Sequence, residues 1–199
     1  MPNLKQSRNT EKILDSTIKV LNESGYSSLT IEAIAIQAGV GKSTIYRWWD
    51  SKADLVLDAF LMTTASTFQF DTKKSVRHNF EQQLINLSVV FNTKLGRSML
   101  AIIVENREIS ERFYTSYLNL RRKEATLFLK TAIKKGEIKS NINIDIVLDM
   151  LFGPIYFRTL IFNQEPDHHF ISGLVQQVME SILPSVNQND NKLKEKNLE

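Results

Sequence analysis

The sequence predicts an all-α protein, and three observations support this. Along most of the 199 residues, apolar side chains recur at intervals of three and four, which is the spacing of one helix face. Glycine and proline number only 7 and 4, too few for the many turns of an all-β fold. Residues that favour helix starts and stops stand at the ends of the periodic segments. We therefore expect three short helices followed by six longer ones.

The first three expected helices are short and are separated by glycine. The first carries an apolar stripe over 13–21 and ends near Gly25, a residue that suits a left-handed C-cap. The second begins after Thr30, a good N-cap, and ends at the Gly39-Val40-Gly41 break. The third covers about 42–49. Three helices of this size enclose a core that is small for independent stability.

Six further helices are expected in the rest of the chain. Ser51-Lys52-Ala53-Asp54 fits a capping box that opens the first of them. Asn143 suits an N-cap, Gly136 suits the end of the longest helix, and Gly153-Pro154 predicts a kink. The expected ranges are about 51–70, 75–93, 95–105, 109–135, 145–162 and 168–183. We divide the chain into a three-helix domain (1–52), a six-helix domain (53–186) and a polar, disordered tail (187–199).

The segment from Thr30 to Lys52 carries the most specific pattern. Two short helices joined by a tight glycine turn are typical of a helix-turn-helix, whose second helix enters the major groove of DNA. The side chains expected to form the core behind it are Ile31, Ile34, Ala35, Val40, Ile45 and Trp49. Those expected to contact DNA are Thr30, Lys42, Ser43, Thr44, Tyr46, Arg47, Trp48 and Lys52. On spacing alone, the same pattern also fits an ordinary helical protein with buried aromatic residues.

Basic residues are concentrated in this segment, although the whole chain has a net charge of only +3. Lys42, Arg47 and Lys52 lie within eleven residues, with Asp50 the one acidic residue among them. Lysine in the first turn of a helix is unfavourable because the helix dipole is positive there. A phosphate bound at that helix end would make Lys52 favourable. The position of the charge therefore indicates DNA more than its total does.

This segment resembles the DNA-binding domain of the TetR family of bacterial transcriptional regulators. The matching positions are Gly25-Tyr26, Thr30-Ile31, Ile34-Ala35, Ala38-Gly39-Val40, Thr44-Ile45-Tyr46, Trp49, Ser51-Lys52 and Leu55. The resemblance covers about residues 10–60. Gly41 stands where the family usually has a serine N-cap, Ser43 where glycine or alanine is common, and Asp50 where proline is frequent. The resemblance implies a helix-turn-helix domain, a ligand-binding body and a homodimer built on the last two helices.

The last two expected helices carry more apolar surface than a single chain readily covers. The segment 145–162 is apolar nearly all round, so it requires cover on more than one side. A symmetric four-helix interface with a second copy would supply that cover, and burial within one chain is the alternative. The expected interface residues are Leu148, Phe152, Ile155, Ile171, Leu174, Val175, Val178 and Met179.

A small apolar or amphipathic effector is expected to bind inside the helical body. Large aromatic and flexible side chains on converging helices can line such a site, although most aromatic residues at helical spacing are simply core. The candidate lining residues are Phe68, Phe91, Met99, Ile103, Phe113, Tyr117, Phe128, Phe152 and Tyr156.

The sequence offers little support for other classes of function. There is no cysteine, no serine–histidine–acid arrangement and no phosphate-binding glycine loop, so we expect no catalytic residues and no cofactor. Adjacent His168 and His169 point about 100° apart on a helix, which disfavours a metal site. Apolar runs are far shorter than the ~20 residues of a membrane span, and no secretory signal is present. A cytoplasmic protein without a membrane partner is expected.

A second basic stretch has two interpretations. Residues 107–139 contain nine Lys or Arg against four Glu. This surplus is compatible with a second site for an anionic partner. The solvated face of a long helix is the simpler interpretation, because charge runs on helices usually face water.

Together these observations predict a homodimeric transcriptional regulator that binds double-stranded DNA. We expect a repressor released from a near-palindromic operator by a small molecule. One alternative is a DNA-binding protein of the same fold without an effector, controlled by a protein partner or by abundance. A helical enzyme or interaction module is the other.

Overall fold

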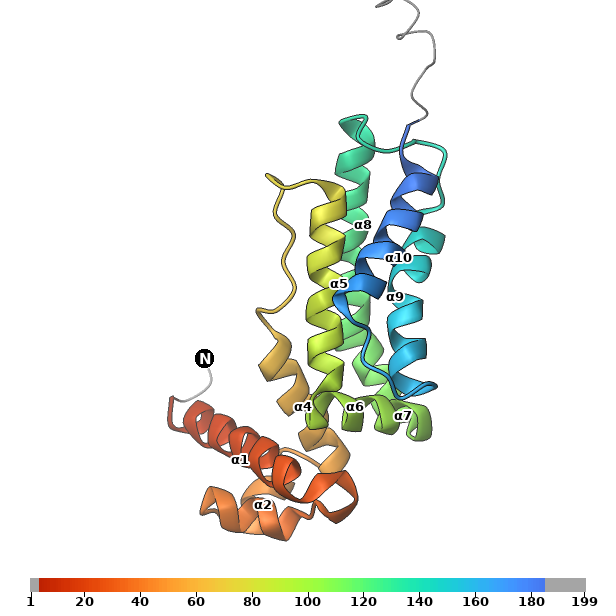
Figure 1. Ribbon diagram of the computed structural model, residues 1–199. Helices are drawn as coiled ribbons and strands as arrows, with labels where there is room; N and C mark the ends of the chain where they lie inside the picture. The colour runs from red at the N-terminus through yellow and green to blue at the C-terminus, as the bar shows by residue number, and fades with distance from the viewer. Residues whose placement is uncertain (1–3, 185–199) are drawn as a thin grey trace, which may run out of the picture.

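The computed structural model describes residues 4–184, and within that range it contains helices and connections without strands (Figure 1). The predicted all-α class is therefore confirmed. The elements are α1 (Leu4–Ser28), α2 (Ile31–Ala38), α3 (Lys42–Tyr46), α4 (Lys52–Thr64), α5 (Val76–Asn92), α6 (Lys94–Glu105), α7 (Arg107–Phe113), the π-helical turn η1 (Tyr114–Leu118), α8 (Asn119–Lys134), α9 (Ile144–Leu160) and α10 (His168–Ile182). The predicted polar tail 187–199 lies outside the described residues.

The head, which we define as α1 to α3, is built around the predicted core. Ile34 and Ile45 are fully buried, Trp49 is 3% exposed, and Val40 packs against them half-buried. The third helix is shorter than the predicted 42–49, since α3 ends at Tyr46. The chain turns there because Trp49 points back into the core, where its indole donates a hydrogen bond to Asp58 on α4.

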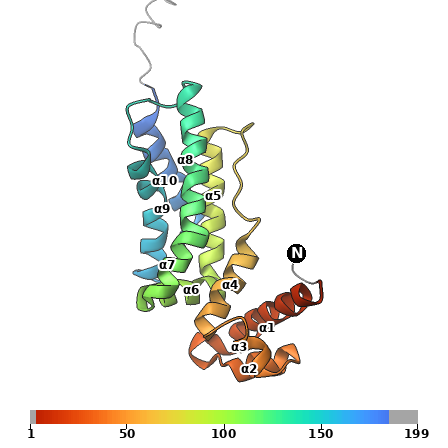
Figure 2. The same cartoon turned by 180° about the vertical axis from the view of Figure 1, so that it is seen from behind.

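The body, which we define as α4 to α10, is a bundle in which α5, α8, α9 and α10 stand side by side (Figure 1, and from behind in Figure 2). Helix α6 crosses the end of this bundle that faces the head, and α7 begins there and continues along the bundle into η1 and α8. Helices α5 and α6 meet at 85°. At this corner Gly96 packs so closely on α5 that a Cβ atom would lie 2.1 Å from the Val90 carbonyl oxygen.

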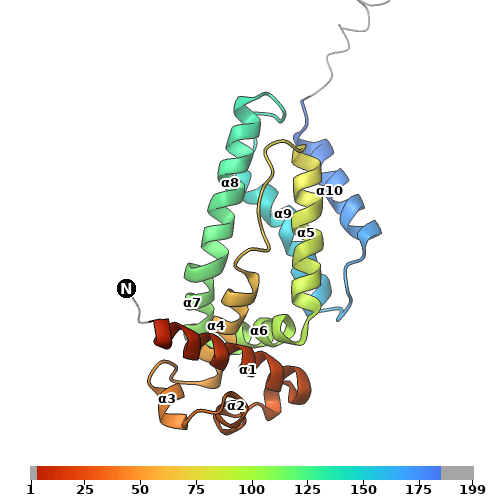
Figure 3. The same cartoon turned by 90° about the vertical axis from the view of Figure 1, so that its left-hand side faces the viewer.

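One predicted helix ends early. The range 51–70 was expected to be helical, but α4 stops at Thr64 and residues 65–75 form an extended strap that runs along the body between α5 and α8 (Figure 3). Thr63, Thr64, Ser66 and Thr67 lie around this helix end, and serine and threonine favour a helix less than alanine or leucine do. The guanidinium of Arg121 on α8 also donates to the carbonyls of Thr64 and Ala65, so it satisfies the end of α4.

The longest predicted helix, 109–135, is confirmed with one irregularity. It begins at Arg107, behind an Asn106 cap, and runs through η1 into α8. Later in the chain, α9 continues as one helix through Gly153 and Pro154 to Leu160. Within residues 4–184 no single helix has the length and apolar character of a membrane span, and the α5–α6 pair reaches them only across its bend.

Candidate nucleic-acid interface and internal cavity

The turn between α2 and α3 is fixed by backbone geometry. Gly39 adopts a left-handed conformation (φ 63°, ψ 40°), which glycine reaches without steric cost. The Val40 amide donates to the Ala35 carbonyl at 3.0 Å, which closes the end of α2. At the other end of α2, the Thr30 hydroxyl accepts from the Ala33 amide at 3.1 Å. Helices α2 and α3 together form the end of the head on the far side of α1 from the body (Figures 2 and 3).

Most of the predicted DNA-contacting side chains are exposed on this end of the head. The exposed members of the set are Thr30, Lys42, Ser43, Tyr46, Arg47 and Trp48. Tyr46 and Trp48 are 53% and 50% exposed, an uncommon degree for large aromatic side chains in a structure with a buried core directly behind them. Thr44 is half-buried. The arrangement offers cations, hydroxyls and aromatic faces to one partner surface.

Lys42 pairs with Glu32 on the preceding helix, with an Nζ–Oε1 distance of 2.8 Å. The hydrogen bond and charge of Glu32 raise the pKa of Lys42, and the same contact lowers the pKa of Glu32. Both side chains are more than half exposed, so the pair contributes little to stability. Lys42 can therefore exchange this partner for a phosphate at low cost.

The structure places Lys52 differently from the other basic residues of the segment. Its ammonium donates to the carbonyls of Tyr26 (3.0 Å) and Leu29 (3.1 Å) and lies 4.6 Å from the centre of the Tyr26 ring. These carbonyls lie after the break in α1 at Gly25, and the Lys52 ammonium gives them a charged hydrogen-bond donor. This contact explains a lysine in the first turn of α4 without a bound phosphate.

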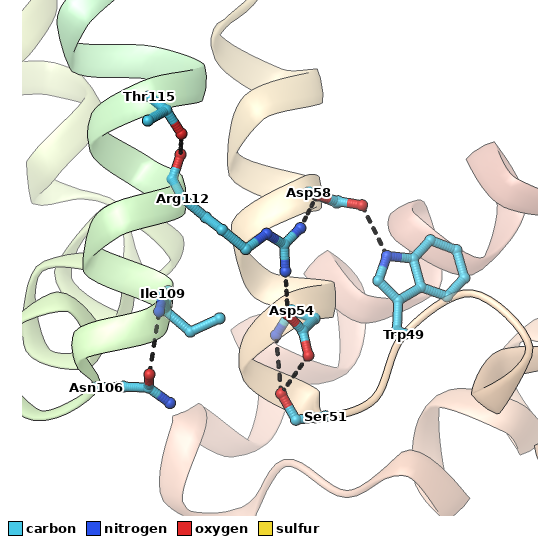
Figure 4. A network of polar contacts seen from close by, with 8 residues as sticks. All are labelled: Trp49, Ser51, Asp54, Asp58, Asn106, Ile109, Arg112 and Thr115. Carbon is cyan, nitrogen blue, oxygen red and sulfur yellow. Dashed lines mark hydrogen bonds and ion pairs between the residues drawn. The ribbon is translucent and has the colours of Figure 1, made fainter.

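A polar network joins the head to the body through α4 (Figure 4). The Trp49 indole donates to Asp58 (2.8 Å), and Asp58 in turn accepts from Arg112 of α7 (3.4 Å). Arg112 also pairs with Asp54, whose carboxylate accepts from the Ser51 hydroxyl at 2.7 Å. The predicted cap at Ser51 is confirmed, because the Asp54 amide donates to its hydroxyl.

The body encloses a cavity of about 250 Å³ between the strap, α5, η1, α8 and α9. It is lined by Phe68, Phe70, Gln83, Leu87, Tyr117, Leu118, Arg121, Arg122, Glu124, Ala125, Asp149, Phe152, Gly153 and Tyr156. A shallower hollow beside it shares Phe68, Phe70 and Glu124 and leads to the surface between the strap and α8. The cavity therefore has a wall in which five aromatic side chains stand beside four charged ones.

The charged groups of the cavity wall are paired. Arg121 contacts Glu124 at 3.0 Å, and Arg122 contacts Asp145 at 3.0 Å and Asp149 at 2.6 Å. Burial raises the pKa of both Tyr117 and Tyr156, so the two phenols remain uncharged at any physiological pH.

Comparison with known proteins matches both parts of the chain. Residues 13–59 match the family described as bacterial regulatory proteins, tetR family, and residues 71–178 match the tetracyclin repressor-like C-terminal domain. The HTH-type transcriptional regulator YdeS of Bacillus subtilis is 30% identical over 174 residues, with 85% of this chain and 87% of that protein covered. The chain belongs to the TetR family. It is accordingly a DNA-binding transcriptional regulator, and the matches are not to an enzyme family.

Two further similarities extend over nearly the whole TetR-family fold. The HTH-type transcriptional regulator Rv1556 of Mycobacterium tuberculosis is 32% identical over 181 residues, covering 90% of this chain and 88% of the relative. The crystal structure of the TetR family transcription regulator SCO0332 has a TM-score of 0.72 at 27% identity and covers 88% of this chain and 99% of its own.

The predicted ligand-site residues of this TetR-family regulator separate into two groups. Phe68, Tyr117, Phe152 and Tyr156 line the cavity, and Phe128 lines the adjoining hollow. Phe91, Met99 and Phe113 are buried in the core, and Ile103 packs against that core. Sequence reasoning missed Arg121, Arg122 and Glu124, because charges in the 107–139 stretch look like a solvated helix face. The sequence could have indicated Arg121, because it lies four residues after Tyr117 and so on the same side of a helix.

The predicted dimer residues are mostly used within the protomer. Leu148, Ile155, Ile171, Val175, Val178 and Met179 are each at most 3% exposed, and Phe152 and Leu174 are half-buried. Helices α9 and α10 direct these side chains toward α5 and toward each other. The six buried side chains leave no surface for a partner, whereas Phe152 and Leu174 keep part of theirs. The apolar side chains that α9 and its end leave exposed are Ile146, Met150, Phe157, Leu160, Ile161 and Phe162.

Proposed function

We propose that this TetR-family protein is a homodimeric repressor that leaves its operator when a small molecule binds in the body. The observation that carries the proposal is the exposed basic and aromatic surface of α3, held by a buried core on a rigid glycine turn. Lys42 and Arg47 supply donors for phosphates and guanine edges, and the hydroxyls of Ser43 and Tyr46 supply donors for phosphates. A bacterial regulator meets its DNA in the cytoplasm, where we place the protein.

Dimerisation is supported by the apolar surface of α9. Met150, Phe157 and Leu160 are 43%, 52% and 42% exposed on a helix whose other side is fully buried. A symmetric contact between two copies of this surface would cover it and would present two α3 helices to DNA. Two such helices read half-sites one helical turn apart, about 34–36 Å, which gives a near-palindromic operator.

Release by an effector is supported by the way α4 is held at both ends. Near its start, Arg112 binds Asp54 and Asp58, and Asp58 binds Trp49 of the head. At its end, Arg121 binds the Thr64 and Ala65 carbonyls and also lines the cavity. A ligand that displaces Arg121 would therefore act on the helix that positions α3. A coupling of about 1–3 kcal/mol would change operator affinity ~5–150-fold.

The test of DNA recognition is competitive binding to duplexes. The purified full-length protein is titrated against the DNA upstream of its own gene and against a shuffled duplex of equal length, at several salt concentrations. We expect tighter binding to the native duplex and a log–log salt slope of about −0.9 per phosphate contacted. Equal affinity for the two duplexes would overturn the proposal.

A further inference from the structure

The side chains that line the cavity in the body determine which ligand shapes and polarities it can accept. Phe68, Phe152, Tyr117 and Tyr156 present rings from the strap, α9 and η1, so a flat ring entering the cavity meets aromatic surface on several sides. Ring pairs of this kind favour stacked or edge contacts. The volume of about 250 Å³ lies below the ~300–1,000 Å³ typical of sites for drug-sized molecules, so one or two fused rings fill it.

Two hydroxyl groups of this wall have unmet hydrogen-bonding capacity. Tyr117 is 4% exposed, and in the described part of the chain no side chain or backbone group bonds its hydroxyl. The Tyr156 hydroxyl likewise has no partner among residues 4–184. Neither hydroxyl oxygen is among the fully buried polar atoms without a partner, so both keep accessible surface and can donate a hydrogen bond to a ligand oxygen in the cavity.

Tyr117 also stands in an unusual segment. It belongs to η1, a single π-helical turn between two α-helices. Such turns are rare and frequently occur at functional sites, where the added residue redirects side chains. The Tyr117 ring here contacts Phe60 of α4 at 5.1 Å between ring centres. It therefore connects the cavity wall to the helix that leads to the head.

The charged groups of the cavity wall are ion-paired, and the one buried nitrogen among them without an acceptor in the described residues is Nε of Arg121. Arg121 and Arg122 each contact a carboxylate, and both phenols are held uncharged by burial. An anionic or cationic ligand would have to break one of these pairs or bury its own charge without a partner, and both are costly.

We propose that this cavity binds a small, uncharged aromatic compound whose carbonyl or hydroxyl oxygen pairs with the hydroxyl of Tyr117. The proposal rests on the proposed function, since it names the class of effector for the site in the body. It also specifies what the cavity rejects, namely aromatic carboxylates, arylalkyl ammonium ions and long acyl chains.

The test compares probes that share a ring system and differ in charge. Binding of 2-acetonaphthone (neutral), 2-naphthoate (anionic), 2-naphthylmethylamine (cationic) and decanoate to the full-length protein is measured by calorimetry. We expect 2-acetonaphthone to bind at least tenfold more tightly than each of the others. Equal or tighter binding of 2-naphthoate or decanoate, or no binding of 2-acetonaphthone, would overturn the proposal.

A pair of variants tests the role of Tyr117. Tyr117→Phe keeps the ring and removes the hydroxyl, so we expect affinity for 2-acetonaphthone to fall about 2–10-fold. Tyr114→Phe, at a half-exposed ring one turn earlier, is the matched control and leaves affinity unchanged. An unchanged affinity in folded Tyr117→Phe contradicts the assignment. Because these measurements contain no DNA, a protein that prefers its native duplex but fails here loses only this inference.

Discussion

The contacts of Lys52 and Gly96 show how single residues set the positions of helices in this protein. The ammonium of Lys52 binds two carbonyls at the end of α1 from the first turn of α4, and so connects the two helices. Gly96 acts through the absence of a side chain. At the α5–α6 corner this absence lets the start of α6 approach the Val90 carbonyl. Both residues act on packing within the chain.

Replacing Lys52 tests whether this residue stabilises the fold or contacts DNA phosphates. Lys52→Ala removes two hydrogen bonds from a charged donor, so we expect the free energy of unfolding to fall by about 1–3 kcal/mol. The salt slope of DNA binding by the folded protein should stay unchanged. Lys42→Ala is the control, with an unchanged melting temperature and a slope smaller in magnitude by about 0.9. A smaller slope for Lys52→Ala would return Lys52 to the phosphate-contacting set.

Replacing Gly96 tests the corner between α5 and α6. The added methyl group of Gly96→Ala would overlap the Val90 carbonyl oxygen at 2.1 Å, so the helix start must move. We expect a loss of about 1–3 kcal/mol of stability, measured by denaturant unfolding. Ser98→Ala, on the same helix with its hydroxyl bonded only to the Lys94 carbonyl, should change stability little. A wild-type unfolding midpoint for Gly96→Ala would refute the close contact.

At the scale of elements, α4 is the shared part of head and body. Trp49 and Ser51 contact its start from the head, Arg112 of α7 contacts Asp54 and Asp58 along the same side, and Arg121 of α8 contacts its end. The angle of α4 therefore depends on both the head and the cavity wall. Movement of α7 and η1 would reach α3 through these contacts.

Replacing Arg112 tests this coupling. Arg112→Ala leaves Asp54 and Asp58 without their cation and frees α4 from α7. We expect a modest loss of stability, about 1 kcal/mol because the guanidinium is 41% exposed, and a severalfold change in operator affinity. Arg107→Ala is the matched control, since its pair with Glu111 on the same helix is largely solvated. Identical operator affinities for the two variants would show that Arg112 does not position α4.

At the scale of the whole molecule, the protein has one long apolar surface to cover. The cores of head and body are closed within one chain, whereas Ile146, Met150, Phe157 and Leu160 of α9 stay exposed. Ile161 and Phe162 extend that surface past the helix end. A dimer that covers it also fixes the distance between the two α3 helices.

A charge on this surface tests the dimer. Phe157→Lys places an ammonium at the centre of the proposed contact, so we expect sedimentation velocity to show a monomer and operator affinity to fall at least tenfold. Val104→Lys, at a 73% exposed apolar position on α6, is the control and should remain dimeric. A dimer in folded Phe157→Lys would mean that another surface joins the two copies.

The sequence by itself determined the helix class, the core of the head and the outward set on α3. These follow from local periodicity, capping residues and glycine positions, which act within a few residues of the chain. The sequence also identified α9 as the helix with apolar residues on nearly every side, and it identified four residues that line the cavity.

Tertiary structure decided which side of α9 is buried and which side remains exposed. Helix α9 is apolar nearly all round, so its sequence alone does not distinguish the side that meets α5 from the side left exposed. Lys52 and Arg121 are ordinary basic residues in sequence, and their roles depend on carbonyls 23 to 57 residues away. The strap likewise replaced a predicted helix because Arg121 completes the end of α4. Contacts between distant segments determine these outcomes, and local pattern does not encode them.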